Sequence, residues 1–379
     1  MRTKQKKEIR TTQTDQPIDR QPLDQFKEPL RSKIGFRAAT LFLDKQAKLS
    51  TRVVADMIRE EFKKEIKESE VEFNFTDVYA SVRVVVERGL ILWNPPINQK
   101  MGDDLRERYR LQKGEDKDTV RVVDVSPDSP DSVSEAAANL AHHLIKERFK
   151  ANGGKPVVLG LGPGNSTLSF SRRLGELLRD ERSGLKLKLV GISSGCPPTQ
   201  PNLAPVSFFN LFPARVIAGS IALLAGPLVE QENHRNRLET VVGLKEAYAI
   251  HETIDIVITS MGDFHDAHDG LADLLKNQES QCEKNDWVGS VQYRGYSEKG
   301  PITGDQEDFR VVTLFELDDL KHMATHGAKS VILIARPCSA CSPPATKARA
   351  MGPLLTNPKL RVFSHLVIDS ESARELLTP

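Results

Sequence analysis

The stretch Val157–Leu168, VVLGLGPGNSTL, contains the residues best suited to binding an anion. An apolar run typical of a strand leads into a glycine loop, and a helical pattern follows it. The candidate binding residues in the loop are Gly162, Gly164, Asn165, Ser166 and Thr167. Glycines let a ligand approach the backbone, and a helix N-terminus presents N–H groups, so this order is typical of phosphate binding. A tight strand–helix turn that binds nothing is the alternative interpretation.

Further apolar runs predict the sheet that positions this loop. The expected strands are Val120–Val125, Val157–Leu161, Leu187–Ile192, Ile254–Thr259, Val331–Ala335 and Leu366–Ile368. Each run is continuous, as in strands buried on both faces, and helical patterns separate them. We therefore expect an α/β domain with a mostly parallel sheet, whose ligand lies beyond the carboxyl ends of the strands.

Polar residues follow several of these strands, where a ligand would bind. Ser194 and Gly195 are small enough for close approach to a hydroxylated ligand. Gly262 and Asp263 begin an acidic loop. Lys347 opens a helix and supplies a point charge suited to phosphate, although a solvated lysine is the alternative.

Two segments contain side chains that can ligate metals. One loop holds His265, Asp266, His268 and Asp269, and a separate loop holds a CxxC pair, Cys338 and Cys341. A CxxC pair is either redox-active or half of a zinc site. The remaining cysteines, Cys196 and Cys282, are far away in sequence, and the histidine loop has no second ligand set at recognised spacing. We therefore expect two reduced thiols, no metal and no cofactor.

The first third of the chain differs in character. Residues 1–32 are polar, basic near the start and without periodicity, which predicts a flexible tail. Residues 33–100 show three helical patterns and a short strand, Leu90–Trp93, the arrangement of a winged helix-turn-helix domain. Its third helix is the candidate DNA reader, with Thr76, Asp77, Tyr79, Ser81 and Arg83 on the expected outer face. A helical module for oligomerisation or protein docking is the alternative.

Composition limits the other possibilities. The 379 residues carry a net charge of +1, so the chain as a whole has no strong electrostatic attraction to a polyanion. Four cysteines are too few for a disulfide scaffold in a chain of this length. The N-terminus does not resemble a signal peptide, and the longest apolar stretch, Val216–Val229, is short and interrupted. We therefore expect a cytoplasmic protein with no membrane partner.

The order of segments resembles the effector domain of SorC/DeoR-type sugar-responsive transcriptional regulators. The matching landmarks are LRERYRL, GLGPGNSTL, Ser220–Leu228, Thr259–Phe264, Trp287–Gly300, Thr346–Leu355 and His365–Leu377. The resemblance implies an effector domain over residues 101–379, related in fold to ribose phosphate isomerases and glucosamine phosphate deaminases. It also implies a phosphorylated sugar effector that is not turned over, a DNA operator and a homo-oligomer.

The chain departs from the family pattern at several places. The glycine loop is one residue longer, Ser290 stands where the family commonly has aspartate, and the loop before Lys347 is rich in cysteine and proline. A charged run over residues 60–72 lengthens the helix-turn-helix unit. We keep Ser290 as a ligand-binding candidate. The alternative function is a sugar phosphate isomerase or deaminase, with Asp263, His265 and Asp266 as acid and base groups.

Overall fold

The structure is a computed structural model that divides into two compact units, residues 1–93 and 94–379. It describes residues 30–43, 48–69, 71–87, 94–111, 119–125, 131–179, 181–194, 200–224, 228–230, 244–266, 268, 286–302, 309–325, 328–338, 340–341 and 345–378. Nearly all of the expected tail and the expected wing strand, Leu90–Trp93, lie outside the described residues. The division after residue 93 falls near the boundary expected at residue 100.

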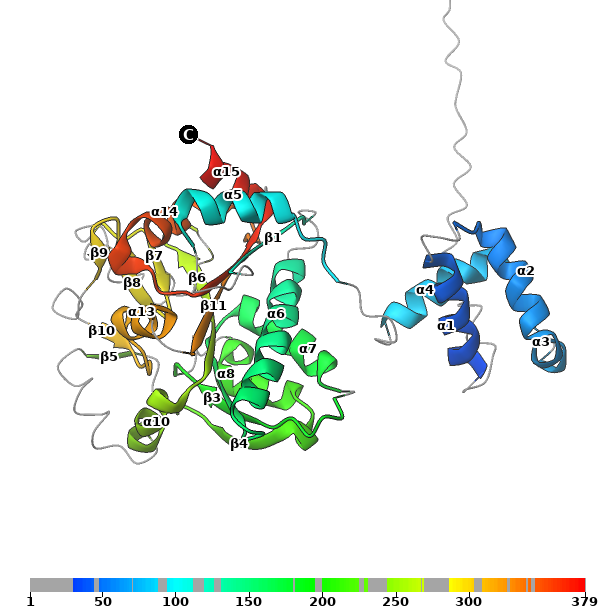
Figure 1. Ribbon diagram of the computed structural model, residues 1–379, viewed down its shortest axis with the longest axis horizontal. Helices are drawn as coiled ribbons and strands as arrows, with labels where there is room; N and C mark the ends of the chain where they lie inside the picture. The colour runs from blue at the N-terminus through cyan, green and yellow to red at the C-terminus, as the bar shows by residue number, and fades with distance from the viewer. Residues whose placement is uncertain are drawn as a thin grey trace, which may run out of the picture. The chain divides into compact units, whose positions relative to one another are not determined.

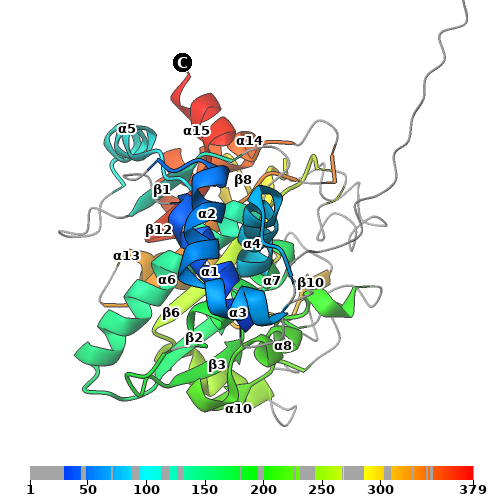
Figure 2. The same ribbon diagram turned by 90° about the vertical axis from the view of Figure 1, so that its right-hand side faces the viewer.

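The first unit is helical in its described part. Its helices are α1 (Leu30–Leu43), α2 (Thr51–Glu61), α3 (Lys63–Ser69) and α4 (Phe75–Glu87). Helices α1, α2 and α4 pack against one another (Figure 2) around a core that includes Ile34, Ile58, Phe73 and Val78. Helix α3 occupies the charged run and has no fully buried residue. The extra length of the helix-turn-helix pattern is therefore an additional, exposed helix.

Side chains cap the first turn of two helices in this unit. Ser50 caps α2 by accepting a hydrogen bond from the Val53 N–H at 3.4 Å. Helix α4 begins one residue before Thr76, because Asn74 Oδ1 accepts the Thr76 N–H at 3.0 Å. Asp77 Oδ2 accepts the Asn74 N–H in return at 2.7 Å. These two bonds form a capping box with Asn74 as the N-cap residue.

The second unit is built on a parallel sheet. Its strands are β1 (Val120–Val123), β2 (Val157–Leu161), β3 (Leu187–Gly191), β4 (Ile217–Ile221), β5 (Leu228–Glu230), β6 (Ile256–Asp263), β7 (Gly289–Val291), β8 (Arg294–Ser297), β9 (Gly300–Pro301), β10 (Phe309–Val311), β11 (Ser330–Ala335) and β12 (His365–Asp369). The parallel order is β1-β12-β11-β6-β2-β3-β4. Strands β7, β8 and β9 extend antiparallel from the end of β6, and β5 pairs with β10.

All six expected strands are present, which confirms the predicted α/β fold. The additional parallel strand, β4, is an edge strand with the sequence IAGSI, which is half-exposed and contains glycine and serine. Its sequence therefore lacks the continuous apolar run that marks a strand buried on both faces. This is why the sequence did not indicate it.

Helices cover both faces of the sheet (Figure 1). They are α5 (Gln99–Tyr109), α6 (Asp131–Ala151), α7 (Asn165–Leu177), α8 (Pro205–Phe208), α10 (Leu244–Ile250), α13 (Leu317–Thr325), α14 (Ala348–Thr356) and α15 (Ser370–Leu377). Helices α6, α7 and α8 lie on one face, and α5, α13, α14 and α15 lie on the other.

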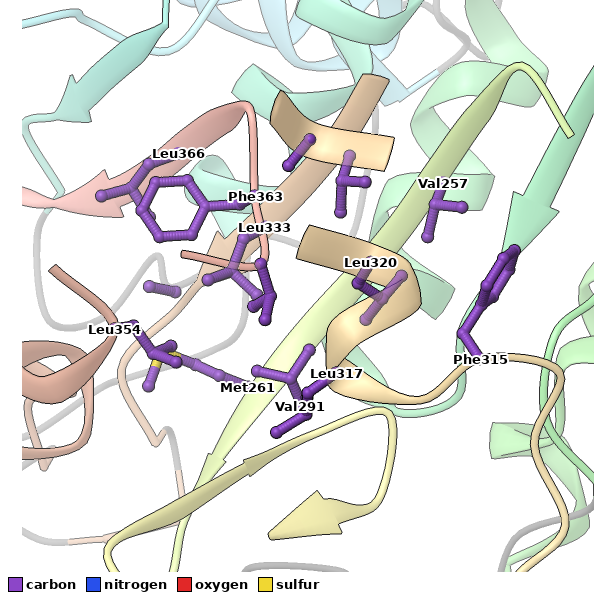
Figure 3. Close-up of a cluster of buried hydrophobic side chains, with 14 of the residues drawn as sticks. Val257, Met261, Val291, Phe315, Leu317, Leu320, Leu333, Leu354, Phe363 and Leu366 are labelled. Carbon is purple, nitrogen blue, oxygen red and sulfur yellow. The ribbon is translucent and has the colours of Figure 1, made fainter. Parts of the chain in front are cut away.

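Successive strand residues point to opposite faces of the sheet and fill two separate cores. Ile332 and Ile334 pack into the core beneath α6 and α7, whereas Leu333 packs into the core with α13 and α14. Figure 3 shows this second core, where Leu333 lies near Leu354 and Leu366. Among the described residues, none of the helices combines the length and apolar character that crossing a bilayer requires.

Candidate functional site

The glycine loop connects β2 to α7 at the carboxyl edge of the sheet. Gly164 is the residue before α7 and has φ of 102°, which favours glycine. The Gly162 N–H donates to the Ile258 carbonyl at 2.8 Å, and the Gly164 N–H donates to the Leu203 carbonyl at 3.1 Å. These two amides are therefore engaged within the protein. The glycines shape the loop, and the donors left for an anion belong to the first turn of α7.

The three polar residues of that first turn differ in exposure. Asn165 is exposed and Ser166 is half-buried, whereas Thr167 is fully buried. Thr167 Oγ1 donates to the Pro163 carbonyl at 3.4 Å. The Thr167 side chain thus closes the turn from inside. Its backbone N–H remains one of the first-turn donors.

Gln292 lies against the glycine loop, although the sequence did not indicate it. It occupies the turn between β7 and β8, where Gln292 and Tyr293 both have positive φ, 57° and 59°. The residue is 3% exposed, and neither Oε1 nor Nε2 has a hydrogen-bond partner. A Cβ placed on Gly162 would lie 2.5 Å from Gln292 Nε2. An unpaired buried amide is costly, and a bound ligand with hydroxyl groups would satisfy it.

The end of β3 presents two further unpaired polar groups. Ser193 and Ser194 are 2% and 0% exposed, and neither Oγ atom has a hydrogen-bond partner. Two backbone contacts position these serines. Ser193 forms an isolated antiparallel β-bridge with Thr313, and the Ser194 N–H donates to the Val312 carbonyl at 2.8 Å. Gly195, the other candidate in this loop, lies outside the described residues.

The end of β6 brings three more candidates together. Gly262 is paired with Ser290, and Asp263 is paired with Gly289, across the antiparallel contact of β6 with β7. Asp263 and Ser290 are each 7% exposed. Asp263 Oδ1 accepts the His265 N–H at 3.0 Å, which fixes the turn that follows. The strand that carries Ser290 therefore also leads directly to Gln292.

Lys347 is not a free positive charge. Its side chain is buried, and Nζ lies 2.8 Å from Asp266 Oδ2. Burial alone would raise the pKa of Asp266, but hydrogen bonds from the Lys347 ammonium and the His268 N–H lower it to about 2. The ammonium that the sequence suggested as a counter-charge for phosphate is therefore already paired with Asp266.

Arg336 is a cation beside α7 that the sequence reading did not select. It follows β11 directly and forms an ion pair with Asp131, whose Oδ1 also accepts the Ser169 hydroxyl at 2.8 Å. Ser169 belongs to the second turn of α7. Arg336 is thus held close to the helix whose first turn presents the free N–H groups.

The CxxC pair lies against the histidine loop. Cys341 Sγ lies 3.5 Å from Asp266 Oδ1 and 3.5 Å from His268 Nδ1. A hydrogen bond with Cys338, together with burial and the nearby Asp266 carboxylate, raises the pKa of Cys341 to about 11. The expectation of no metal site rested on treating the two loops separately, and the structure joins them. His265 is exposed in the same loop and Asp269 lies outside the described residues.

The DNA-reading candidates divide into two groups on α4. Thr76, Tyr79 and Arg83 are exposed, and Tyr79 is 58% exposed. Asp77 and Ser81 are 1% and 0% exposed, so placing them on the outer face was wrong. Asp77 belongs to the capping box, and Ser81 Oγ donates to the Asp77 carbonyl at 2.6 Å. Burial raises the pKa of Asp77, although the hydrogen bond from Asn74 opposes this.

Comparison with known proteins identifies the family of the larger unit. The family model described as "Putative sugar-binding domain" matches residues 98–378. The chain therefore belongs to this sugar-binding domain family. A search of curated protein sequences found no match.

Solved structures extend the comparison to both units. The full-length sorbitol operon regulator SorC from Klebsiella pneumoniae has a TM-score of 0.61 at 14% identity, covering 93% of this chain and all of that chain (100%). A sor operon regulator from Shigella flexneri has a TM-score of 0.54 at 16% identity, covering 74% of this chain and 99% of that chain. A DeoR family regulator from Listeria monocytogenes has a TM-score of 0.53 at 17% identity, covering 73% of this chain and 98% of that chain. The resemblance to SorC/DeoR-type proteins inferred from the sequence is confirmed at the level of the fold.

Proposed function

We propose that the protein is a ligand-responsive transcriptional regulator. Residues 94–379 bind a phosphorylated sugar or a closely related polyol phosphate, and the helical unit binds a DNA operator. The observation that carries the proposal is the buried, unpaired amide of Gln292 against Gly162, beside the open first turn of α7. The sugar-binding family and the regulator structures with the same fold support it.

The ligand chemistry follows from the two kinds of group at this edge of the sheet. The N–H groups of Asn165, Ser166 and Thr167 suit a phosphate, because a helix N-terminus combines free donors with a favourable dipole. The Gln292 amide and the Ser193 and Ser194 hydroxyls suit sugar hydroxyls, because each group both donates and accepts.

The DNA-binding part of the proposal rests on helices α4 and α2. Thr76, Tyr79 and Arg83 share one exposed stripe at helical spacing. Arg52 of α2 lies over the Phe75 ring at 5.8 Å, so a second arginine is held near the start of α4. Exposed arginine, tyrosine and threonine provide base-edge and phosphate contacts. Regulators that read paired half-sites are oligomers, so a homo-oligomer belongs to the proposal.

We also propose that the site binds its ligand without converting it. The competing function, a sugar phosphate isomerase or deaminase, needs a general base poised near neutral pH. Asp266 is instead held ionised by Lys347, and Asp263 Oδ1 is already occupied by the His265 N–H. Incubation with each ligand found, followed by NMR over hours, should show no product. Turnover that is abolished in Asp263→Asn would favour the enzyme.

A thermal-melt panel tests the ligand proposal. Sugar phosphates and polyol phosphates should be compared with the same sugars without phosphate and with inorganic phosphate. A ligand at 100 times its Kd stabilises the protein by about 2.7 kcal/mol, which is readily seen as a rise in Tm. We expect a phosphorylated sugar to raise the Tm more than either component alone. Equal shifts with inorganic phosphate would contradict recognition of the sugar, and no shift with any compound would contradict the proposed site.

A further inference from the structure

Four metal-ligating side chains from two loops meet at the carboxyl edge of the sheet. Asp266 and His268 lie in the loop after β6, and Cys338 and Cys341 lie in the loop after β11. One ligand atom from each of the four lies within 4.8 Å of all the others. The carboxylate of Asp266 is buried, and the other three side chains are partly or fully accessible. A metal ion could therefore enter from solvent and bind a preassembled set.

Four of the six distances between these four atoms match the edges of a tetrahedron. Zinc binds sulfur at about 2.3 Å and nitrogen or oxygen at about 2.0–2.1 Å, which places neighbouring ligand atoms about 3.3–3.8 Å apart in tetrahedral geometry. His268 Nδ1 lies 3.5 Å from Cys341 Sγ, 3.7 Å from Cys338 Sγ and 3.5 Å from Asp266 Oδ1. Cys341 Sγ lies 3.5 Å from Asp266 Oδ1. All four distances fall in the required range.

The surroundings of the cluster also suit a divalent ion. Asp266 Oδ2 is held by the Lys347 ammonium at 2.8 Å, and Oδ1 faces the thiols and the imidazole. Such a contact orients the carboxylate and leaves one oxygen for the metal. Two thiolates and one carboxylate carry three negative charges, which a divalent ion and Lys347 together balance. The site would therefore be neutral when the metal is bound.

We propose that Asp266, His268, Cys338 and Cys341 form a zinc-binding site. Two thiolates with one imidazole and one carboxylate favour zinc over magnesium or calcium, which prefer oxygen ligands. On binding, each cysteine loses its thiol proton to solvent, and the metal accepts four ligand bonds. The ion would tie the loop after β6 to the loop after β11, with Asp266 joining the metal to Lys347. The inference does not depend on the proposed regulatory function.

The test uses the full chain and the metal alone. Protein purified with zinc should retain one equivalent after desalting, measured by elemental analysis. After removal of zinc with a chelator, Co²⁺ should produce a thiolate-to-cobalt charge-transfer band and intense visible bands typical of tetrahedral coordination, and added Zn²⁺ should abolish both. Removing zinc should also make two more cysteine thiols reactive toward a thiol reagent. This thiol count needs no variant, so it is unaffected by any folding defect.

Substitutions of the proposed ligands test where the ion binds. Cys338→Ser and Cys341→Ser should abolish the charge-transfer band, and His268→Ala should weaken cobalt binding by at least about tenfold. Matched controls are His265→Ala, an exposed histidine of the same loop, and Cys282→Ser, which also removes one thiol. Both controls should bind cobalt as the wild type does. A circular dichroism spectrum and melt confirm that each variant is folded.

Three results would overturn the proposal. The first is wild-type protein that retains no stoichiometric zinc and gives no tetrahedral cobalt spectrum. The second is a spectrum that survives in the folded Cys338→Ser/Cys341→Ser double variant. The third is as-purified protein in which the two thiols are absent and no metal is present, because that would make the pair a disulfide.

Discussion

Gln292 is the residue on which the proposed ligand site depends most. Its amide is buried without a partner, while its backbone takes the left-handed conformation of a tight hairpin turn. A glutamine with φ above zero and an unsatisfied side chain is unfavourable for folding alone. Such a local energetic cost is typical of residues that bind a ligand. The sequence did not indicate Gln292, because a single glutamine in a short hairpin has no pattern that distinguishes it.

Replacing Gln292 should separate binding from stability. Gln292→Leu removes two unpaired polar atoms from a buried position, so the free energy of unfolding should stay constant or rise by roughly 1–3 kcal/mol. Affinity for the sugar phosphate should fall about tenfold, because the hydroxyl contacts are lost. Calorimetric binding and denaturant unfolding measure the two effects. Loss of stability together with unchanged affinity would show that the amide serves the fold.

Gly162→Ala tests the same contact from the other side. The new Cβ would lie 2.5 Å from Gln292 Nε2 and 3.1 Å from the Ile258 carbonyl, so the amide must move. We expect ligand affinity to fall at least about tenfold. Gly352→Ala is the matched control, because nothing lies within 4 Å of its Cβ position. It should leave affinity unchanged, and equal effects in both variants would contradict the argument.

Glu181 gives a prediction for the pH dependence of stability. Hydrogen bonds from Ser183, with smaller effects from Lys146, lower the pKa of Glu181 from 4.5 to about 2. A carboxyl with a lower pKa in the folded state stabilises the protein above its unfolded pKa, and this contribution is lost as pH falls toward 2. Glu181→Gln should therefore flatten the fall in stability between about pH 4.5 and pH 2. Glu147→Gln, at an exposed position of α6, should follow the wild-type curve in denaturant melts.

At the scale of elements, the sequence predicted the buried sheet well and the loops poorly. Continuous apolar runs located β2, β3 and β11 to within one residue, because burial on both faces leaves a clear signal. The contact between the loops after β6 and β11 had no such signal. Asp266 and His268 lie about seventy residues from Cys338 and Cys341, and only adjacent parallel strands bring them together. Each loop contains only two of the four possible metal ligands, so neither loop has the sequence pattern of a complete metal site.

Helix α4 allows a test of DNA recognition at this scale. Arg83→Ala should weaken specific DNA binding by roughly 1–3 kcal/mol if Arg83 contacts a base edge. Arg349→Ala removes the same charge from an exposed position of α14 in the other unit and serves as the control. Fluorescence anisotropy with specific and scrambled duplexes compares the two variants. Equal losses in both, or a loss that is the same on scrambled DNA, would contradict base reading by α4.

At the scale of the whole molecule, the chain joins a small helical unit to a larger sugar-binding unit. A net charge of +1 supplies little general attraction to DNA, so specific contacts on the helical unit must provide it. The function we propose requires that the two units communicate. A ligand changes DNA affinity only when it binds the DNA-competent and DNA-incompetent states unequally.

The most direct test is DNA affinity measured with and without the effector. A duplex selected from a random library by the full chain should be titrated with wild-type protein and with Gly162→Ala, in the presence of the phosphorylated sugar that raises the Tm. We predict that the ligand changes the wild-type Kd for DNA by about 5- to 150-fold, in either direction, and leaves the variant nearly unaffected. A library selection with no enriched sequence, or a wild-type Kd that no bound ligand changes, would contradict a ligand-responsive regulator.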